Sequence, residues 1–199
     1  MNGEAVLSNA PGERIVINDP ESTLIAELRK RGPGRVMVCS GSNSVDANGG
    51  IRFISRALEA AGRELFRCRL KPEPSTSAVA SLIQIIREEK PAAVIAIGGG
   101  SAMDAAKAAY LTAQSGWELA DHFGVNRWSE ACPDANPDRV ICIPTTSGTG
   151  SEATPYSNIV DFGLGVKKLI SERFLVPELA LLIPELTASM DFRISAGVS

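Results

Sequence analysis

Apolar and polar positions fall into short alternating blocks along the chain. Apolar runs of strand length predict β-strands at residues 14–17, 35–39, 64–70, 92–97 and 139–143. Between them, apolar residues recur at helical spacing, which predicts helices over residues 22–30, 50–61, 75–89 and from a glycine turn at 98–101 to about residue 114. Ser22 is the expected N-cap of the first helix. Repeated strand–helix units predict an α/β fold with an open parallel sheet and helices on both faces.

Two stretches lack this regularity. Residues 116–138 are rich in Trp, Pro, Asp and Asn, which predicts an irregular surface segment. The single histidine, His122, lies in it, and we interpret it as a surface or helix-end residue rather than a catalytic group. From Val166 onward the pattern is mixed and assigns no element.

The glycine turn at residues 98–101 carries the strongest chemical signal. It lies between an apolar strand and an alanine-rich helix, so backbone N–H groups and the helix dipole favour an anion there. Glycines let a phosphate approach without a side chain in the way, and we predict nucleotide binding rather than a purely structural turn. Ser101 and Asp104 match a capping box, so we interpret Asp104 as a capping or orienting residue.

A second turn, at residues 145–152, also follows an apolar strand and is rich in hydroxyl groups. Ligands gather at this edge of open α/β sheets, so the turn could bind phosphate and ribose, or it could satisfy only its own backbone. Its serines do not stand in the Gly-x-Ser-x-Gly pattern of a hydrolase nucleophile.

A third turn, at residues 40–44, follows the strand at 35–39. In dinucleotide sites an acid at such a strand end binds the adenosine ribose, but these residues are Ser-Gly-Ser-Asn-Ser. Small hydroxyl residues could accommodate a 2′-phosphate instead, and an ordinary turn is the alternative.

Composition excludes several classes of protein. The net charge of −3 gives no basic footprint for nucleic acid, and no apolar run approaches the roughly 20 residues of a membrane span. The four cysteines stand without a Cys-x-x-Cys pair, which argues against a zinc knuckle and fits reduced thiols in a cytoplasmic protein. Cys39 and Cys142 lie in strand-like runs and are expected in the core.

Together, the turns at residues 98–107 and 144–152 resemble the two signatures of iron-containing (group III) alcohol dehydrogenases. Residues 71–75 resemble a third landmark, and order and spacing agree from about residue 12 to residue 197. The resemblance implies a Rossmann-like, dehydroquinate-synthase-like N-terminal domain that binds NAD or NADP, over residues 1–184. It implies that residues 185–199 begin a helical metal-binding domain whose remainder is absent here.

The resemblance also implies which residues contact the cofactor. These are Ser40, Gly41 and Ser42 in the third turn, Gly99, Gly100 and Ser101 at the pyrophosphate, Thr145, Thr146 and Thr149 in the second turn, and Lys167, with Lys168 as the alternative, near the nicotinamide ribose. Such enzymes hold iron or zinc with one Asp and three His, and a chain with one histidine lacks those ligands. No catalytic or metal-binding residue is therefore assigned.

Three functions follow from this resemblance. The first is the cofactor-binding half of an NAD(P)-linked alcohol dehydrogenase or aldehyde reductase, inactive alone, with a small alcohol or aldehyde as substrate and a homodimer as the suggested assembly. The second is a dinucleotide-binding module without catalysis. The third, a dehydroquinate-synthase-like lyase, is disfavoured by the sequence of the second turn.

Overall fold

The computed structural model describes residues 14–41, 44–71 and 73–188. A six-stranded sheet forms its centre, and every pairing between these strands is parallel. Its order is β1-β9-β6-β4-β2-β3, comprising β1 (Ile15–Val16), β9 (Leu179–Leu181), β6 (Ile141–Pro144), β4 (Ala93–Gly98), β2 (Val36–Ser40) and β3 (Leu65–Arg69). The predicted open parallel sheet is confirmed.

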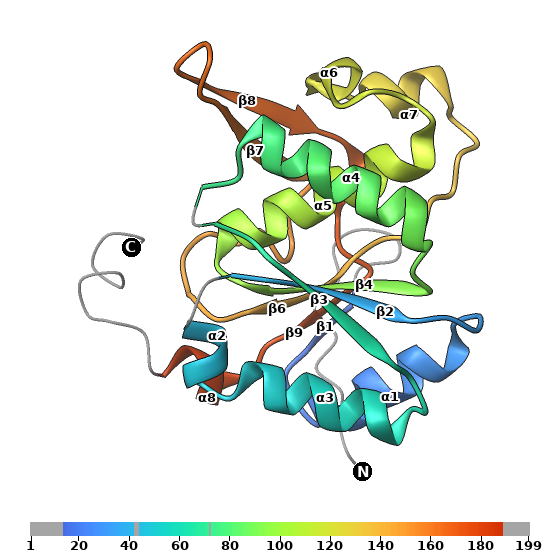
Figure 1. The fold of residues 1–199 in the computed structure, drawn as a ribbon, viewed down its shortest axis with the longest axis vertical. Coiled ribbons are helices and arrows are strands. Elements are labelled where there is room, and N and C mark those ends of the chain that lie inside the picture. Colours follow the sequence, from blue (N-terminus) through green and yellow to red (C-terminus); the bar gives the residue numbers. More distant parts are fainter. Residues whose placement is uncertain (1–13, 42–43, 72, 189–199) are drawn as a thin grey trace.

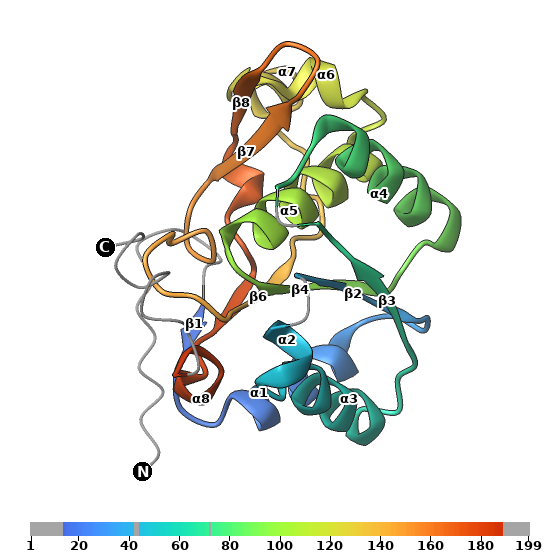
Figure 2. The ribbon, with the colours of Figure 1, turned by 60° about the vertical axis from the view of Figure 1, so that its left-hand side comes forward.

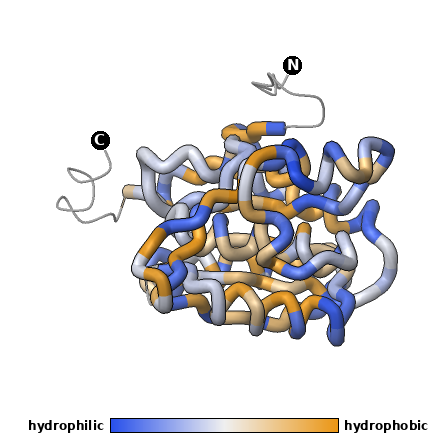
Figure 3. The backbone as a smooth tube through the Cα atoms, turned by 90° about the horizontal axis from the view of Figure 1, so that it is seen from above, coloured by the Kyte–Doolittle hydropathy of each residue, from blue (hydrophilic) through white to orange (hydrophobic). Residues whose placement is uncertain are grey.

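Helices cover both faces of this sheet (Figure 1). One face carries α1 (Pro20–Lys30) and α3 (Gly50–Ala60), and the other carries α4 (Thr76–Glu89) and α5 (Gly100–Ser115). Central strands are covered twice, so all six residues of β4 are buried, as a continuous apolar run requires. Hydrophobic and hydrophilic stretches alternate along the chain as it passes from core to surface (Figure 3).

A second sheet, of three strands, lies beyond α4 and α5 (Figure 2). Its order is β5-β8-β7, with β5 (Gly124–Val125), β8 (Val166–Ser171) and β7 (Tyr156–Asp161). Strands β7 and β8 form an antiparallel hairpin whose inner residues Ile159 and Ile170 join the core around α4 and α5. The sequence pattern assigned no element to this region.

The remaining elements are short. They are α2 (Ser44–Ala47), α6 (Leu119–His122), α7 (Arg127–Ala131), the 3-10 helix η1 (Arg173–Leu175) and α8 (Pro184–Thr187). None of the helices in the described part of the chain is both long and apolar enough to cross a membrane.

Two local expectations are wrong. Asp19, not Ser22, caps α1, because Pro20 starts the helix earlier and the Asp19 carboxylate accepts from the Ser22 amide. Residues 116–138 are not merely an irregular surface segment: they contain α6, β5 and α7, and Trp128 is buried. These elements are too short for their periodicity to show in the sequence.

Candidate nucleotide site

Three turns meet where the strand order reverses. From β2 the chain moves outward to β3 and then returns to the other side of β2 as β4. The carboxyl ends of the neighbouring strands β2 and β4 therefore form a topological switch point. Hydrogen bonds connect the turns that leave these strands. The Gly41 amide donates to the Ile97 carbonyl at 3.0 Å, and the Thr145 amide donates to the Gly98 carbonyl at 2.9 Å.

The glycine turn begins at Gly98, whose φ of +144° disfavours any residue with a side chain. A Cβ at Gly98 would also lie 3.2 Å from the backbone nitrogen of Gly41. Gly99 is the N-cap of α5 and caps it with no side-chain hydrogen bond. The first amides of a 16-residue helix therefore face this turn with a positive helix end and no protein side chain as cap, which suits a phosphate.

The second turn packs directly on the first. A Cβ at Gly99 would lie 3.3 Å from Thr146 Oγ1, and a Cβ at Gly100 would lie 3.0 Å from atoms of Thr149 and Ser151. Thr145 is buried and Thr146 half-buried, whereas Thr149 and Ser101 are exposed. The structure thus brings the predicted glycines and threonines together at one place.

A buried lysine on α5 holds the second turn in position. Lys107 is 2% exposed, and its Nζ donates to the carbonyls of Ser151 and Thr154, each at 2.9 Å. Burial lowers the pKa of this ammonium, an effect that nearby Cys142 and Asp104 oppose. Lys107 thereby ties the helix that begins at the glycine turn to the second turn, through Ser151, and to the loop that follows it, through Thr154.

Asp104 bonds forward to β7 rather than back to the helix start. Its Oδ2 accepts from the Asn158 amide at 3.0 Å, and its carbonyl accepts from the Ser157 hydroxyl at 2.8 Å. Burial raises the pKa of the carboxyl, against the bond from Asn158. The expected capping box of Ser101 and Asp104 is therefore wrong.

Sequence reasoning also missed the role of Lys107. The available signal was a charged pair, Asp104 and Lys107, three residues apart on a helix whose other neighbours are small and apolar. A helix face that is apolar except for one acid and one base indicates charges held inside the protein.

The third turn has contacts that its sequence did not suggest. Ser40 is fully buried, and its Oγ accepts from Arg67 Nε at 2.7 Å. Gly41 is half-buried, and Ser42 lies outside the described residues. The same Arg67 forms two bonds with Asp46 of α2, at 2.6 and 3.1 Å.

The predicted lysine lies on the hairpin. Lys167 is exposed on β8, opposite Val160 of β7. Its neighbour Lys168 forms a 2.8 Å ion pair with Asp161 and lies over the Phe123 ring. Lys167 therefore belongs to a different sheet from the turns, and its cofactor contact stays a prediction.

His122 ends α6, as expected, but it is not a surface residue. It is 1% exposed, lies between Trp117 and Trp128, and bonds the Ser115 hydroxyl through Nε2 at 2.8 Å. Burial lowers its pKa, against the attraction of Glu172.

The described residues offer no metal centre: no three His, Cys, Asp or Glu side chains among them are grouped to hold an ion. All four cysteines are free thiols, and Cys39 and Cys142 are buried as predicted. Burial raises the pKa of Cys142 to about 12, so this thiol is packed as an apolar group.

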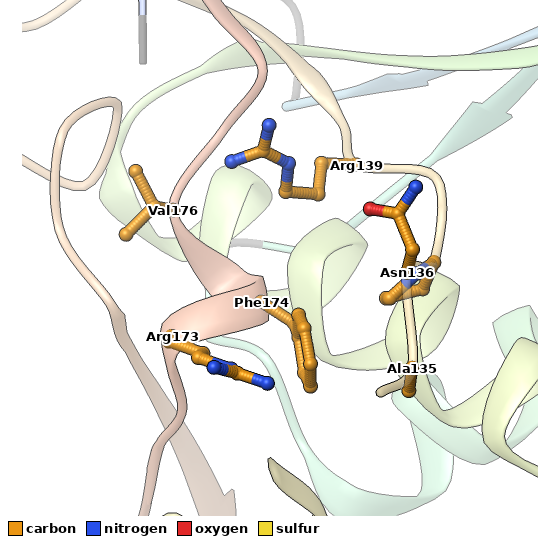
Figure 4. A pocket seen from close by; sticks show the side chains of 7 residues that line it. Ala135, Asn136, Arg139, Arg173, Phe174 and Val176 are labelled. Atoms are coloured by element: carbon orange, nitrogen blue, oxygen red, sulfur yellow. The ribbon is translucent and has the colours of Figure 1, made fainter. Parts of the chain in front are cut away.

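A hollow of about 370 Å³ lies at the opposite end of the sheet (Figure 4). Arg139, which precedes β6, and Phe174, in the segment that leads to β9, line it. Both segments lie at the amino ends of parallel strands, whereas the three turns follow carboxyl ends. The hollow is therefore separate from the nucleotide site.

Comparison with known proteins gives consistent matches. The family model described as iron-containing alcohol dehydrogenase matches residues 12–184. A 1-propanol dehydrogenase of Salmonella typhimurium is 36% identical over 145 residues, which are 72% of this chain and 34% of that protein. An NADPH-dependent butanol dehydrogenase of Clostridium saccharobutylicum is 27% identical over 177 residues, 86% of this chain and 44% of that protein.

Solved structures agree with this. An iron-containing alcohol dehydrogenase of Thermococcus thioreducens has a TM-score of 0.79 at 27% identity, covering 94% of this chain and 49% of that one. The chain thus spans about half, or less than half, of the length of these relatives.

Proposed function

Because the chain belongs to the iron-containing alcohol dehydrogenase family, we propose that it is the cofactor-binding part of an NAD(P)-linked alcohol dehydrogenase or aldehyde reductase. The complete reaction would move a hydride between nicotinamide and a small alcohol or aldehyde. Relatives named as propanol and butanol dehydrogenases support this substrate class.

One observation carries the proposal: the two signature turns pack on each other at the switch point of the sheet. A Cβ added at Gly99 would lie 3.3 Å from Thr146 Oγ1, and Gly99 is the N-cap residue of α5, where no side chain caps the helix. Helix amides and threonine hydroxyls at one place provide donors for a pyrophosphate and a ribose.

The glycine turn and the three threonines then have roles in cofactor binding. The amides that follow Gly99 would bind the pyrophosphate, while Thr145, Thr146 and Thr149 would contact the ribose and phosphate oxygens. Lys107 and Asp104 would position these groups without touching the cofactor, since both bond to protein backbone. When bound, the nicotinamide supplies or accepts the hydride.

The domain division remains part of this proposal. Residues 1–184 would form the dinucleotide-binding domain, and 185–199 would begin the helical domain that holds the family's iron or zinc. The described residues do not fit that metal, since they contain no suitable ligand group. No step of the chemistry is therefore assigned to a metal on this chain.

The second candidate is a dinucleotide-binding module without catalysis, since the uncapped helix start and the packed turns can hold a cofactor without any metal ligand. The coding sequence downstream of Ser199 discriminates between the two. An open frame that encodes an Asp and several His favours the enzyme, and a stop codon favours the module.

Titration of the protein with NADH and NADPH, followed by nicotinamide fluorescence, tests the site. We expect weak but measurable binding that Gly99→Leu abolishes, because the leucine side chain would fill the phosphate position. Gly32→Leu is the matched control, since a Cβ at Gly32 meets nothing within 4 Å. Unchanged binding by a folded Gly99→Leu protein would contradict the phosphate assignment.

A further inference from the structure

A cluster of three charged side chains lies beside the third turn: Asp46, Arg67 and Arg69. Arg67 and Arg69 stand on β3 in register with Val38 and Ser40 of β2, and their bonds to Asp46 place them by α2. Arg69 is the last residue of its strand. The cluster therefore lies at the carboxyl end of the sheet, next to the turn where dinucleotide folds bind the adenosine ribose.

Arg67 is fixed in this cluster. Its Nε donates to Ser40 at 2.7 Å, and its two terminal nitrogens bond both oxygens of Asp46. Its side chain is only 15% exposed. The buried Ser40 therefore holds the Arg67 guanidinium from one side, and the bidentate bond to Asp46 fixes the plane of that group.

Arg69 is held much more loosely. Its described bond is from Nη2 to Asp46 Oδ2, an oxygen that Arg67 also uses, and 59% of its side chain is exposed. Two guanidinium groups share one carboxylate, so the cluster keeps a formal charge of +1. A guanidinium that is exposed and shares its acid can exchange that acid for a phosphate, for which its fork geometry is suited.

From this geometry we infer that Arg69, supported by Arg67, binds the 2′-phosphate of NADP(H) and makes the site prefer that cofactor. The inference rests on the proposed function and deepens it. It replaces the Ser40 hydroxyl as the basis of that preference, because this hydroxyl is buried against Arg67. An arginine near the ribose is the usual means of accepting this phosphate.

Asp46 gives the inference a test of opposite sign. Its carboxylate attracts both arginines and would repel a phosphate, and the Arg67 bonds lower its pKa, so it is charged at neutral pH. Asp46→Asn removes that charge while keeping the shape, so it should strengthen NADPH binding. A purely structural ion-pair cluster would show no such gain.

The experiment measures NADPH and NADH affinity in four proteins: unmodified, Arg69→Ala, Asp46→Asn and the control Arg35→Ala. Arg35 precedes β2 at the other end of the sheet and forms a similarly exposed ion pair with Glu89. Adenosine 2′,5′-bisphosphate and adenosine 5′-monophosphate serve as second probes, because they differ only in the 2′-phosphate.

We expect Arg69→Ala to weaken NADPH binding by about tenfold or more and to change NADH binding by less than about twofold. Asp46→Asn should tighten NADPH binding by about threefold or more, and Arg35→Ala should change neither. The affinity for the bisphosphate should change among the variants as the affinity for NADPH does, and the affinity for the monophosphate should change as the affinity for NADH does.

Two results would overturn the inference alone. In one, the unmodified protein binds NADH at least as tightly as NADPH; in the other, Arg69→Ala weakens both cofactors equally. If neither cofactor nor either adenosine probe binds the unmodified protein, the proposed function fails as well. These outcomes separate an error about the arginines from an error about the site.

Discussion

Two charged clusters near the carboxyl end of the central sheet differ in how far they are exposed to solvent. Asp104 and Lys107 on α5 are 8% and 2% exposed, and their partners are backbone groups of residues 151–158. Arg69 and Asp46 are 59% and 38% exposed and bond to each other. The buried cluster can only shape the protein, whereas the exposed one can exchange a protein partner for a ligand.

The largest expected effect comes from breaking the buried cluster. Lys107→Met removes the donor of two carbonyls and should lower the free energy of unfolding by about 2–5 kcal/mol, since each buried group left unsatisfied costs about 1–3 kcal/mol. Arg69→Met, its counterpart in the exposed cluster, should cost less than about 1 kcal/mol. Urea denaturation of both variants measures the contrast.

Equal losses of unfolding free energy in Lys107→Met and Arg69→Met would contradict this contrast between the buried and the exposed cluster. A loss for Lys107→Met below about 0.5 kcal/mol would mean that water or another donor satisfies the Ser151 and Thr154 carbonyls, and that the helix does not hold the second turn.

A smaller change in stability should come from the protonation of His122, a buried titratable group away from both clusters. Burial lowers its pKa below the usual 6.5, so between those two values the unfolded chain binds more protons than the folded one. Its contribution to stability is therefore fully present above about pH 6.5 and is lost as the pH falls through that window toward the folded pKa.

Thermal unfolding between pH 7.5 and pH 5 tests this. The unmodified protein should lose stability over that range more steeply than His122→Asn, whose side chain does not titrate there. We compare slopes rather than stabilities, because the substitution also removes packing between Trp117 and Trp128. Identical slopes would place the proton uptake on other groups.

A feature of this molecule can be predicted from the sequence when the residues that determine it are close together in the chain. The strands and long helices of the central sheet are readable because apolar runs and helical spacing are local, and the glycine turn is readable because Gly98 and Gly99 lie directly between two such elements. The Ser151 and Thr154 partners of Lys107 lie 44 and 47 residues away. No local pattern reports such a contact.

The third turn illustrates the same limit. Residues 40–44 lack an acid, and this much is visible in the sequence. That Arg67 and Arg69 lie beside that turn follows only from the pairing of β2 with β3, which the strand order decides. The hairpin of β7 and β8 was missed because its outer face carries exposed apolar side chains, among them Tyr156 and Leu169, which obscure the alternation.

The smallest expected effect is that of added metal, because each charged cluster has one acid and at least one base. Asp104 lies near Lys107, and Asp46 already bonds two arginines, so neither offers the roughly three ligands that an open catalytic site needs. His122 bonds Ser115 inside an aromatic cluster. We expect no alcohol oxidation by this 199-residue chain, and stoichiometric Fe²⁺ or Zn²⁺ should change neither that nor the melting temperature. Calorimetry and an NAD(P)H assay measure the two quantities, and turnover that rises with metal and disappears in His122→Ala would show that the chain builds a metal site around that histidine.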